Sequence, residues 1–388
     1  MWKMFNTKFP EYAVKESFFR ALFNTKFNLV FNALQTDVCS RCLELKSRIK
    51  NTRDLNQKQE LMTESRIHKL KAKAFFDLLK EEKAEMLTMS YDCQKNLVVP
   101  KIPDQQANYK RHFYMYNFAI VVGTSKSLLK KDNVFCYTWK ETDKGKGSNE
   151  IASAIFDRLQ KLNLDNVTDL RLCSYGCRGQ NKNLTMITMV CTWLQRAPTH
   201  VKSIELVFPV TGHSYIPPDR VFANIEKKIR KKDTIINPQE YLDLFSESGS
   251  VQVLGVNWKV YDWQEQVKAH VRATSSLPFK INSCKRVIIT KNTKGNVIVQ
   301  GEPFYKHLIG TAQGICKKGK TFYDINPDEM STGNRNIKPE KIKNVDELLT
   351  GHFGSTWKEE AENLRLQYYR DVLCDENRGN EEVEDIPL

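Results

Sequence analysis

The chain has 388 residues, too many for one domain of average size, and its length predicts two or three domains, each large enough to bury a core. It carries 60 Lys and Arg against 46 Asp and Glu, a formal net charge of +14, which favours polyanionic partners. The chain has no apolar run of about 18 residues and no signal-peptide core at its start, which excludes membrane-spanning and secreted classes and predicts an intracellular protein. The ten cysteines are therefore expected to be mostly reduced thiols.

Residues 1–86 are predicted to form an N-terminal helical region. Residues 43–86 contain no Gly or Pro and space their apolar residues as a long helix or a helical hairpin does. Cys39 and Cys42 have the two-residue spacing of half a zinc site, which needs four ligands, and His68 is the best further candidate by residue type. Two interpretations stay open: a zinc site completed by a folded neighbour, or two thiols that face a helix.

Three strands and a helix are predicted next. Residues 87–93, 113–122 and 133–139 are rich in aromatic and β-branched residues, and Asp92 lies near the end of the first strand. Ser148 is placed to cap a helix over residues 149–162, with Glu150 in its first turn. A carboxylate there is favoured by the helix dipole alone, which gives Glu150 a structural interpretation beside any catalytic one.

The segment over residues 170–183, followed by the apolar run 184–194, predicts a strand, a tight polar turn and a buried helix. Ligands of open α/β sheets collect at the carboxyl ends of strands, so this turn is a candidate binding site. The candidate nucleic-acid contacts in it are Arg178, Gln180, Asn181, Lys182 and Asn183. Ordinary turn chemistry explains Gly and Asn at such positions equally well.

A further strand over residues 201–208 leads to a turn at 212–219, and a helix is expected to begin near Pro218 with Asp219 in its first turn. The resulting order is three strands, helix, strand, helix, strand, helix. It predicts an α/β fold with a mixed five-stranded sheet and helices on both faces, which is the order of the RNase H-like fold. We expect this core to span residues 87–233.

Short motifs along this core resemble those of a known family. They are YDCQKNL at 91–97, GSNEI at 147–151, GQNKN at 179–183, and GHS at 212–214 with PDRVF at 218–222 and IEK at 225–227. Over about residues 36–230 the chain resembles a group of uncharacterised, transposon-derived insect proteins with a DDE-transposase-like core. The resemblance implies catalytic roles for Asp92 and Asp219 as Mg²⁺ ligands, with Glu150 as a further acid. His213 is either an assisting group there or, as its residue type favours, a histidine of a turn or helix cap. Such acids hold two Mg²⁺ ions that activate a nucleophile at a phosphate.

Position 175 departs from the family pattern. Relatives read Ser-Asp-Gly-Cys where this chain reads Ser-Tyr-Gly-Cys over residues 174–177, so Tyr175 stands in place of an acid. A phenol is neutral at pH 7 and is a poor Mg²⁺ ligand. Asp169 lies six residues back along the strand, about 20 Å away, and cannot substitute. The pattern therefore predicts a protein whose fold suits nucleic-acid binding but whose cleavage chemistry is lost or reduced.

Residues 234–373 are predicted to form a separate C-terminal α+β region, with a hairpin over 285–290 and 297–300 and helices at 345–349 and 358–373. Residues 374–388 are expected to be an acidic, disordered tail. Lys227 and Lys228 belong to the densest basic run, residues 227–232, which is either a solvated face or a phosphate-binding and nuclear-import signal. Arg220 is a further candidate nucleic-acid contact. Localisation is accordingly predicted as nuclear, with cytoplasmic as the alternative.

Three functions remain open from the sequence. The first is a transposase-derived protein that binds nucleic acid, preferably DNA, through a core with an impaired nuclease site. The second is a working Mg²⁺-dependent nuclease or strand transferase built on Asp92, Glu150 and Asp219. The third is a protein-interaction scaffold in which the basic charge is incidental. No membrane partner is expected, and a homo-oligomer is compatible with all three.

Overall fold

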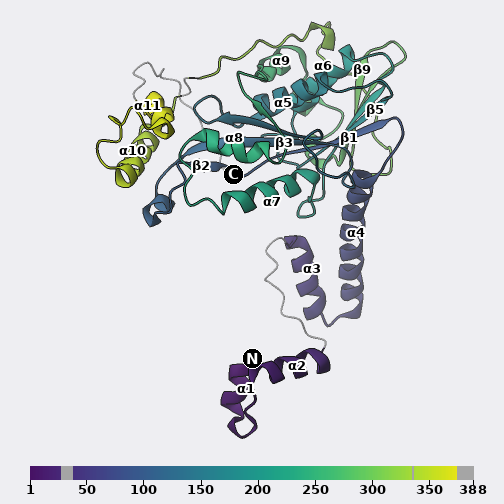
Figure 1. Ribbon diagram of the computed structural model, residues 1–388. Helices are drawn as coiled ribbons and strands as arrows, with labels where there is room; N and C mark the ends of the chain where they lie inside the picture. Colours follow the sequence, from purple (N-terminus) through teal and green to yellow (C-terminus); the bar gives the residue numbers. More distant parts are fainter. Residues whose placement is uncertain (28–37, 334–335, 374–388) are drawn as a thin grey trace.

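The computed structural model describes residues 1–27, 38–333 and 336–373 (Figure 1). The N-terminal region is helical, as predicted. Its helices are α1 (Trp2–Lys8), α2 (Glu16–Lys26), α3 (Ser40–Asn51) and α4 (Leu55–Lys80). Helices α3 and α4 pack against each other as a hairpin, and Asp54 caps the start of α4 by accepting from the backbone N–H groups of Asn56 and Gln57.

The centre of the fold is a mixed sheet that contains nine strands in the described part of the chain. Eight of them follow the order β7-β4-β3-β1-β5-β6-β8-β9, and β2 pairs with β3 beside this path. The strands are β1 (Met86–Cys93), β2 (Leu97–Val99), β3 (Phe113–Val122), β4 (Val134–Lys140), β5 (Asp169–Ser174), β6 (Ser203–Val207), β7 (Ser250–Val253), β8 (Arg286–Lys291) and β9 (Val297–Glu302).

The five strands predicted from the sequence are present and lie side by side in the order β4-β3-β1-β5-β6. Pairing is antiparallel between β1 and β3 and between β3 and β4, and parallel between β1 and β5 and between β5 and β6. The α/β class and the mixed sheet are therefore confirmed, but the predicted size of five strands is wrong. Strands β7, β8 and β9 come from residues 234–373, so the sheet continues across the expected boundary at residue 233.

One face of the sheet is covered by α5 (Ser148–Gln160), α6 (Leu184–Arg196) and α9 (Trp263–His270) (Figure 1). Side chains alternate between the two faces of a strand. Met89 and Tyr91 of β1 accordingly point into the large core under these helices. Helix α6 is buried along nearly its whole length, which explains why its sequence is an unbroken apolar run.

The opposite face is divided between two sets of helices. Helices α7 (Pro217–Ile229) and α8 (Pro238–Ser246) pack on the β1, β3, β4 and β7 side, where α10 (Pro339–Phe353) and α11 (Gln367–Leu373) complete a second core. The C-terminal end of α4 covers β5 and β6 through a third cluster, in which Phe75 and Leu79 meet Cys173 and Val207. The N-terminal hairpin is thus anchored to the same face as α7.

A buried ion network ties α4 to this face. The Arg171 guanidinium lies 2.8 Å from Glu205 and 2.8 Å from Glu81, and it donates to the backbone oxygen of Leu78. Arg286 of β8 contacts the other oxygen of Glu205 at 2.7 Å. Buried charges are tolerated when they are paired and hydrogen-bonded, and each of these cations has a carboxylate partner.

The remaining described elements are short. They are the 3₁₀ helices η1 (Pro10–Tyr12), η2 (Gln105–Tyr109), η3 (Thr274–Ser276), η4 (Ile281–Ser283), η5 (Phe322–Asp324) and η6 (Leu364–Leu366). The helix predicted over 358–373 is present only as η6 and α11, because residues 358–363 form turns. The predicted acidic tail lies outside the described residues. Within the described ranges, no helix is both long and apolar enough to span a bilayer.

Candidate metal centre and neighbouring acidic edge

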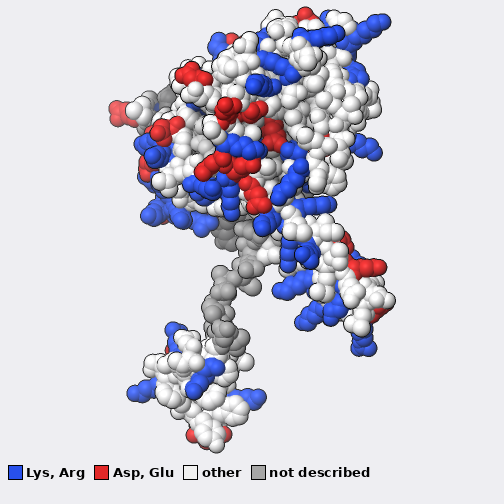
Figure 2. All heavy atoms as spheres, turned by 90° about the vertical axis from the view of Figure 1, so that its right-hand side faces the viewer, with Lys and Arg blue, Asp and Glu red and all other residues white. Residues whose placement is uncertain are grey.

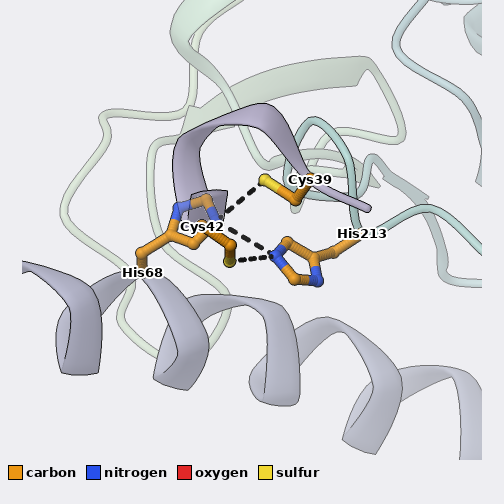
Figure 3. Close-up of side chains that lie close together, drawn as sticks. All are labelled: Cys39, Cys42, His68 and His213. Atoms are coloured by element: carbon orange, nitrogen blue, oxygen red, sulfur yellow. Dashed lines mark hydrogen bonds between the residues drawn. The ribbon is translucent and has the colours of Figure 1, made fainter. Parts of the chain in front are cut away.

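Two cysteines and two histidines converge where the N-terminal hairpin meets the sheet. The ligand atoms of Cys39, Cys42, His68 and His213 all lie within 4.8 Å of one another (Figure 3). Cys39 is buried and the other three are half-buried. Two cysteines and two histidines in this number and arrangement are a donor set for a tetrahedral metal ion such as zinc.

The distances in this Cys/His cluster suit a common central ion. The Cys39 Sγ atom lies 3.3 Å from His68 Nε2, the Cys42 Sγ atom lies 3.2 Å from His213 Nε2, and the two Nε2 atoms are 3.0 Å apart. In a tetrahedral site with metal bonds of about 2.0–2.3 Å, neighbouring ligand atoms are about 3.3–3.8 Å apart. These three separations lie within a few tenths of an ångström of the tetrahedral values, and no two of the four donor atoms are more than 4.8 Å apart.

Each ligand comes from a different part of the local structure. Cys39 precedes α3 and Cys42 lies in its first turn, while His68 projects from the middle of α4. His213 belongs to the turn after β6, where its backbone N–H donates to Val210. The preceding residue must be glycine: Gly212 has φ +79°, and an added Cβ would approach Cys39 to 2.8 Å. Because residue 212 has no side chain, the turn can come close enough to Cys39 for His213 to join the cluster.

The cluster extends and corrects the sequence interpretation. Cys39, Cys42 and His68 come together as the zinc hypothesis required, which favours a metal site over thiols that merely face a helix. His213 supplies the fourth donor, whereas the resemblance implied an assisting role beside the acids. Sequence reasoning missed it because His213 is 145 residues from His68. The adjacent Gly212 was the available signal, since a glycine before a histidine can mark a close backbone approach.

A second group of polar side chains lies at the carboxyl ends of β1 and β5. Tyr91 pairs with Ser174 in the parallel ladder, so Asp92 and Tyr175 follow at matching positions on neighbouring strands. Asp219 approaches from the first turn of α7, which packs on β1. These three residues are called the acidic edge below. Burial raises the pKa of Tyr175, and the neighbouring charges of Asp219 and Asp92 add to that rise.

Tyr175 and Asp219 are joined directly. The Tyr175 hydroxyl lies 3.2 Å from each carboxylate oxygen of Asp219 and donates to them. The same carboxylate accepts from the backbone N–H of Ile216 at 2.7 Å and so caps the start of α7. The Tyr175 ring packs against the cluster that contains Phe75 of α4. Tyr175 therefore links the N-terminal hairpin to the acidic edge.

Burial changes the protonation of the two carboxyl groups. It raises the pKa of Asp92 to about 7, and the neighbouring charge of Asp219 adds to that rise while Lys146 opposes it. Burial also raises the pKa of Asp219, although the Ile216 N–H and the Tyr175 hydroxyl oppose the shift. Buried carboxyl groups that share a site hold protons more tightly because neither can be ionised without loss of solvation.

Glu150, the third predicted acid, has a structural partner. Its carboxylate accepts from the backbone N–H of Gly147 at 2.9 Å at the start of α5. Burial raises the pKa of the Cys93 thiol at the end of β1, and the Glu150 charge adds to that rise. The helix-dipole interpretation therefore accounts for Glu150. Nothing in its hydrogen bonding supports a magnesium role.

The polar turn after β5 is largely structural. The Lys182 ammonium donates to the backbone oxygens of Asn282 and Cys284, and burial lowers its pKa to about 8. Asn183 caps α6 by accepting from Met186. Asn181 is buried and its side-chain amide has no hydrogen-bond partner in the described structure. Arg178 is exposed, and Gln180 and Asn183 are half-exposed, so these three are the predicted contacts of this turn that reach solvent.

The basic residues predicted as nucleic-acid contacts around α7 also differ in whether their side chains are bound within the protein or exposed to solvent. Arg220 donates to the backbone oxygen of Ser127, and Lys228 pairs with Glu247 at 2.8 Å. Lys227 is exposed. Of this group, Lys227 therefore remains the candidate for a phosphate contact that is fully exposed to solvent.

The metal cluster and the acidic edge share one short turn. His213 is a donor in the cluster, and Asp219 caps the helix that begins at Pro217, two residues before it. Any ion that fixes His213 therefore also restrains the segment that carries Asp219. The two sites are mechanically coupled through residues 212–219.

Comparison with protein-family models gives one match. Residues 121–301 match a domain of unknown function, DUF7869. The match begins near the end of β3 and runs to β9, so it crosses residue 233 and includes both the polar turn and His213. The comparison with curated proteins gave no match. The matched range agrees with the sheet in treating residues on both sides of position 233 as one unit.

Proposed function

We propose that this chain is a transposase-derived, nucleic-acid-binding protein whose core is RNase H-like and whose nuclease site is impaired. The order β4-β3-β1-β5-β6, with three antiparallel-linked strands followed by two parallel ones, supports this fold assignment. The additional strands β7, β8 and β9 extend that arrangement at both ends. The transposon origin rests on the motif resemblance.

The observation that carries the proposal is the position of Tyr175. Its hydroxyl meets Asp219 at the carboxyl end of β5, beside Asp92 on β1. Acids that converge at one edge of a sheet are the arrangement that metal-dependent phosphoryl transfer uses. A neutral phenol at the third corner provides no negative charge for a hard cation, and it occupies a hydrogen-bonding site on Asp219.

The protonation of the acidic edge supports weak Mg²⁺ binding. Because the pKa of Asp92 is raised to about 7, part of this carboxyl group is protonated at neutral pH and cannot bind a cation without losing its proton. With Glu150 engaged as a helix cap, Asp92 and Asp219 are the acids that would hold Mg²⁺ there. Two such ligands give a poorer site than three or four carboxylates.

We further propose that the Cys/His cluster binds zinc and that its role is structural. Four protein donors fill a tetrahedral shell and leave no open position for a substrate, which is the pattern of structural zinc sites. The ion would join the hairpin, through Cys39, Cys42 and His68, to the core turn that holds His213. Metal analysis of the purified chain should give one zinc per molecule.

Binding to nucleic acid is the activity that the basic charge supports, with DNA as the preferred ligand and the nucleus as the proposed location. The direct test is a salt series of binding to duplex DNA and to RNA, measured with the full chain. We expect the affinity to fall steeply with salt because phosphate contacts release counterions. An affinity that does not change with salt would instead support a protein-interaction scaffold and contradict the proposal.

The second candidate is a working Mg²⁺-dependent nuclease or strand transferase. The electrostatic coupling of Asp92 and Asp219 favours it, because two carboxyl groups in one site can share a metal ion. The two candidates differ in one measurement: cleavage of DNA by the native chain with Mg²⁺. Efficient cleavage that is lost in Asp92→Asn would establish the second candidate in place of the first.

A further inference from the structure

The helical hairpin carries a one-sided basic surface along α4. Arg66, Lys69, Lys73 and Lys80 are all exposed. At about 100° per residue, these four positions fall within an arc of about 60° on the helix surface. We call this surface the α4 stripe. It is about 21 Å long, since each helical residue rises about 1.5 Å.

Two of the three acids of α4 lie away from the α4 stripe, on the side of the helix that also carries the exposed Lys71. The buried residues Leu61, Ala72, Phe75 and Leu79 face the remainder of the protein. On the same helical wheel, Glu60 and Glu64 lie more than about 100° from the centre of the α4 stripe. Asp77 is the one acid of α4 beside the stripe. Most Lys and Arg side chains gather on one side of the hairpin in Figure 2, and Asp and Glu on the other.

The α4 stripe stands at a fixed place relative to the core. His68 lies between Arg66 and Lys69 in the sequence and points into the Cys/His cluster with His213 (Figure 3). The hairpin projects from the sheet beyond the end of β1 (Figure 1). At the core end, Lys80 lines a surface hollow together with Lys126 and Lys306, and the acids Asp77 and Glu81 line the same hollow.

From these observations we infer that the α4 stripe is the surface that contacts the phosphate backbone of duplex DNA. The inference rests on the proposed nucleic-acid function and assigns its interface. Duplex DNA presents one negative charge per about 1.7 Å of its axis, so an exposed basic row of this length faces a dense line of phosphates. A helix that stands out from the protein can reach a duplex without a clash with the core. The Cys/His cluster holds the helix in that position.

The test compares two variants of the full chain that lose the same charge. Arg66→Gln, Lys69→Gln and Lys73→Gln together remove three charges from the α4 stripe while keeping good helix formers. The control combines Lys294→Gln, Lys318→Gln and Lys320→Gln, which are exposed residues of the C-terminal part. Binding to a labelled 20-base-pair duplex is followed by fluorescence anisotropy between 50 and 200 mM salt.

We expect the α4 stripe variant to bind at least about tenfold more weakly near 100 mM salt than the control. The slope of log affinity against log salt should become shallower by about 2.7, because each lost phosphate contact contributes about 0.9. A third variant, Arg66→Lys, Lys69→Arg and Lys73→Arg, keeps the charges and should bind as the native chain does. Zinc content and thermal unfolding of all variants report on folding.

Three results would overturn the inference, and the first two would leave the proposed function intact. One is equal loss of affinity in the stripe and control variants. Another is strong, salt-dependent binding of RNA with no effect of the stripe on duplex DNA. Binding of the stripe to anionic lipid vesicles, with no binding to DNA, would also overturn it. If the native chain binds no nucleic acid at any salt concentration, the proposed function itself fails.

Discussion

The hydroxyl of Tyr175 lies 3.2 Å from each carboxylate oxygen of Asp219, so a residue in place of an expected acid contacts one of the acids it would have accompanied. Tyr175 also has a structural role. Its ring belongs to the cluster that anchors α4, and its hydroxyl supports the carboxylate that caps α7. This double use explains how the edge can stay ordered with a phenol at position 175.

Removing only the hydroxyl should weaken this edge. We expect Tyr175→Phe to lower the free energy of unfolding by about 1–2 kcal/mol, because a hydrogen bond to a carboxylate is lost while the ring stays packed. The pKa of Asp219 should rise further, since the hydroxyl now lowers it. Chemical denaturation measures the first effect. Tyr323→Phe, at an exposed position, is the matched control and should have no effect.

Restoring an acid should increase cleavage. We expect Tyr175→Asp to raise Mg²⁺-dependent phosphodiester cleavage above the native level, because a third carboxylate improves metal occupancy and positioning. The gain should vanish in Asp92→Asn and Asp219→Asn backgrounds, since the acids act as a unit. The assay follows a supercoiled plasmid with Mg²⁺ and with EDTA. A native chain that cleaves well, with no improvement in the variant, would show that position 175 is outside the metal site.

The same substitution should reduce stability, which separates chemistry from folding. Aspartate cannot replace the aromatic contacts that Tyr175 makes next to Phe75. A loss of about 2–4 kcal/mol is expected for truncation of a packed aromatic ring. Cleavage assays of Tyr175→Asp should therefore be run well below its melting temperature, and thermal unfolding of each variant should be recorded beside its rate.

The metal cluster should control the stability of the hairpin. We expect a strong chelator, or His213→Ala, to remove the zinc and lower the melting temperature, because metal binding contributes directly to folding. Cys42→Ser should act in the same way. Cys177→Ser, an exposed thiol outside the cluster, should keep one zinc per chain. Retention of a full equivalent of zinc in both His213→Ala and Cys42→Ser would contradict the assignment.

Stability should depend on pH through Asp92. Its pKa is raised from 3.8 to about 7, so the folded state binds this proton more tightly than the unfolded state. The folded state is therefore progressively destabilised as the pH rises from about 4 to about 7, by up to about 4 kcal/mol in total. Asp92→Asn removes this dependence and should be more stable than the native chain at pH 8. Denaturant titrations between pH 4 and pH 8 measure the difference, and the exposed Asp165→Asn should not reproduce it.

The buried ion network predicts a large effect from one substitution. Glu205→Ala would leave Arg171 and Arg286 without their shared carboxylate, and the Arg171 side chain is only 3% exposed. A loss of about 3–5 kcal/mol is expected when one partner of a buried pair is removed. Glu16→Ala, which breaks an exposed pair with Arg20, should change stability by less than about 1 kcal/mol. Similar losses in the two variants would argue against the buried network.

Strong local patterns made most of the central elements predictable. The alternation and β-branching over residues 113–122 gave the full extent of β3, and the apolar run from Leu184 gave α6. The four-residue strand β7 was missed because so short a segment has no resolvable period. The boundary expected at residue 233 was placed where the pattern of alternating strands and helices ends. The extent of the sheet depends instead on pairing between strands that are far apart in the chain, and a single sequence does not show that pairing.

Only some residues of the candidate sites could be predicted from the sequence. Asp92, Tyr175 and Asp219 follow recognisable elements, so their approach could be expected from element order. The role of His213 depends on how the hairpin packs against the turn after β6, which is a tertiary contact with no local pattern. Lys182 looked like a phosphate contact in the sequence, yet burial beneath the loop that contains Cys284 gives its ammonium two backbone acceptors instead.

The placement of β7 and β8 has a consequence for any shortened version of this protein. After β6 the chain crosses to the far side to form β7 against β4, and then returns to lay β8 against β6. The last third of the chain therefore closes both borders of the central strands. A fragment that stops at residue 233 would present two rows of unsatisfied backbone groups, which invite pairing between molecules. Such a fragment should self-associate into insoluble material, while the intact chain stays protected by its own returning strands.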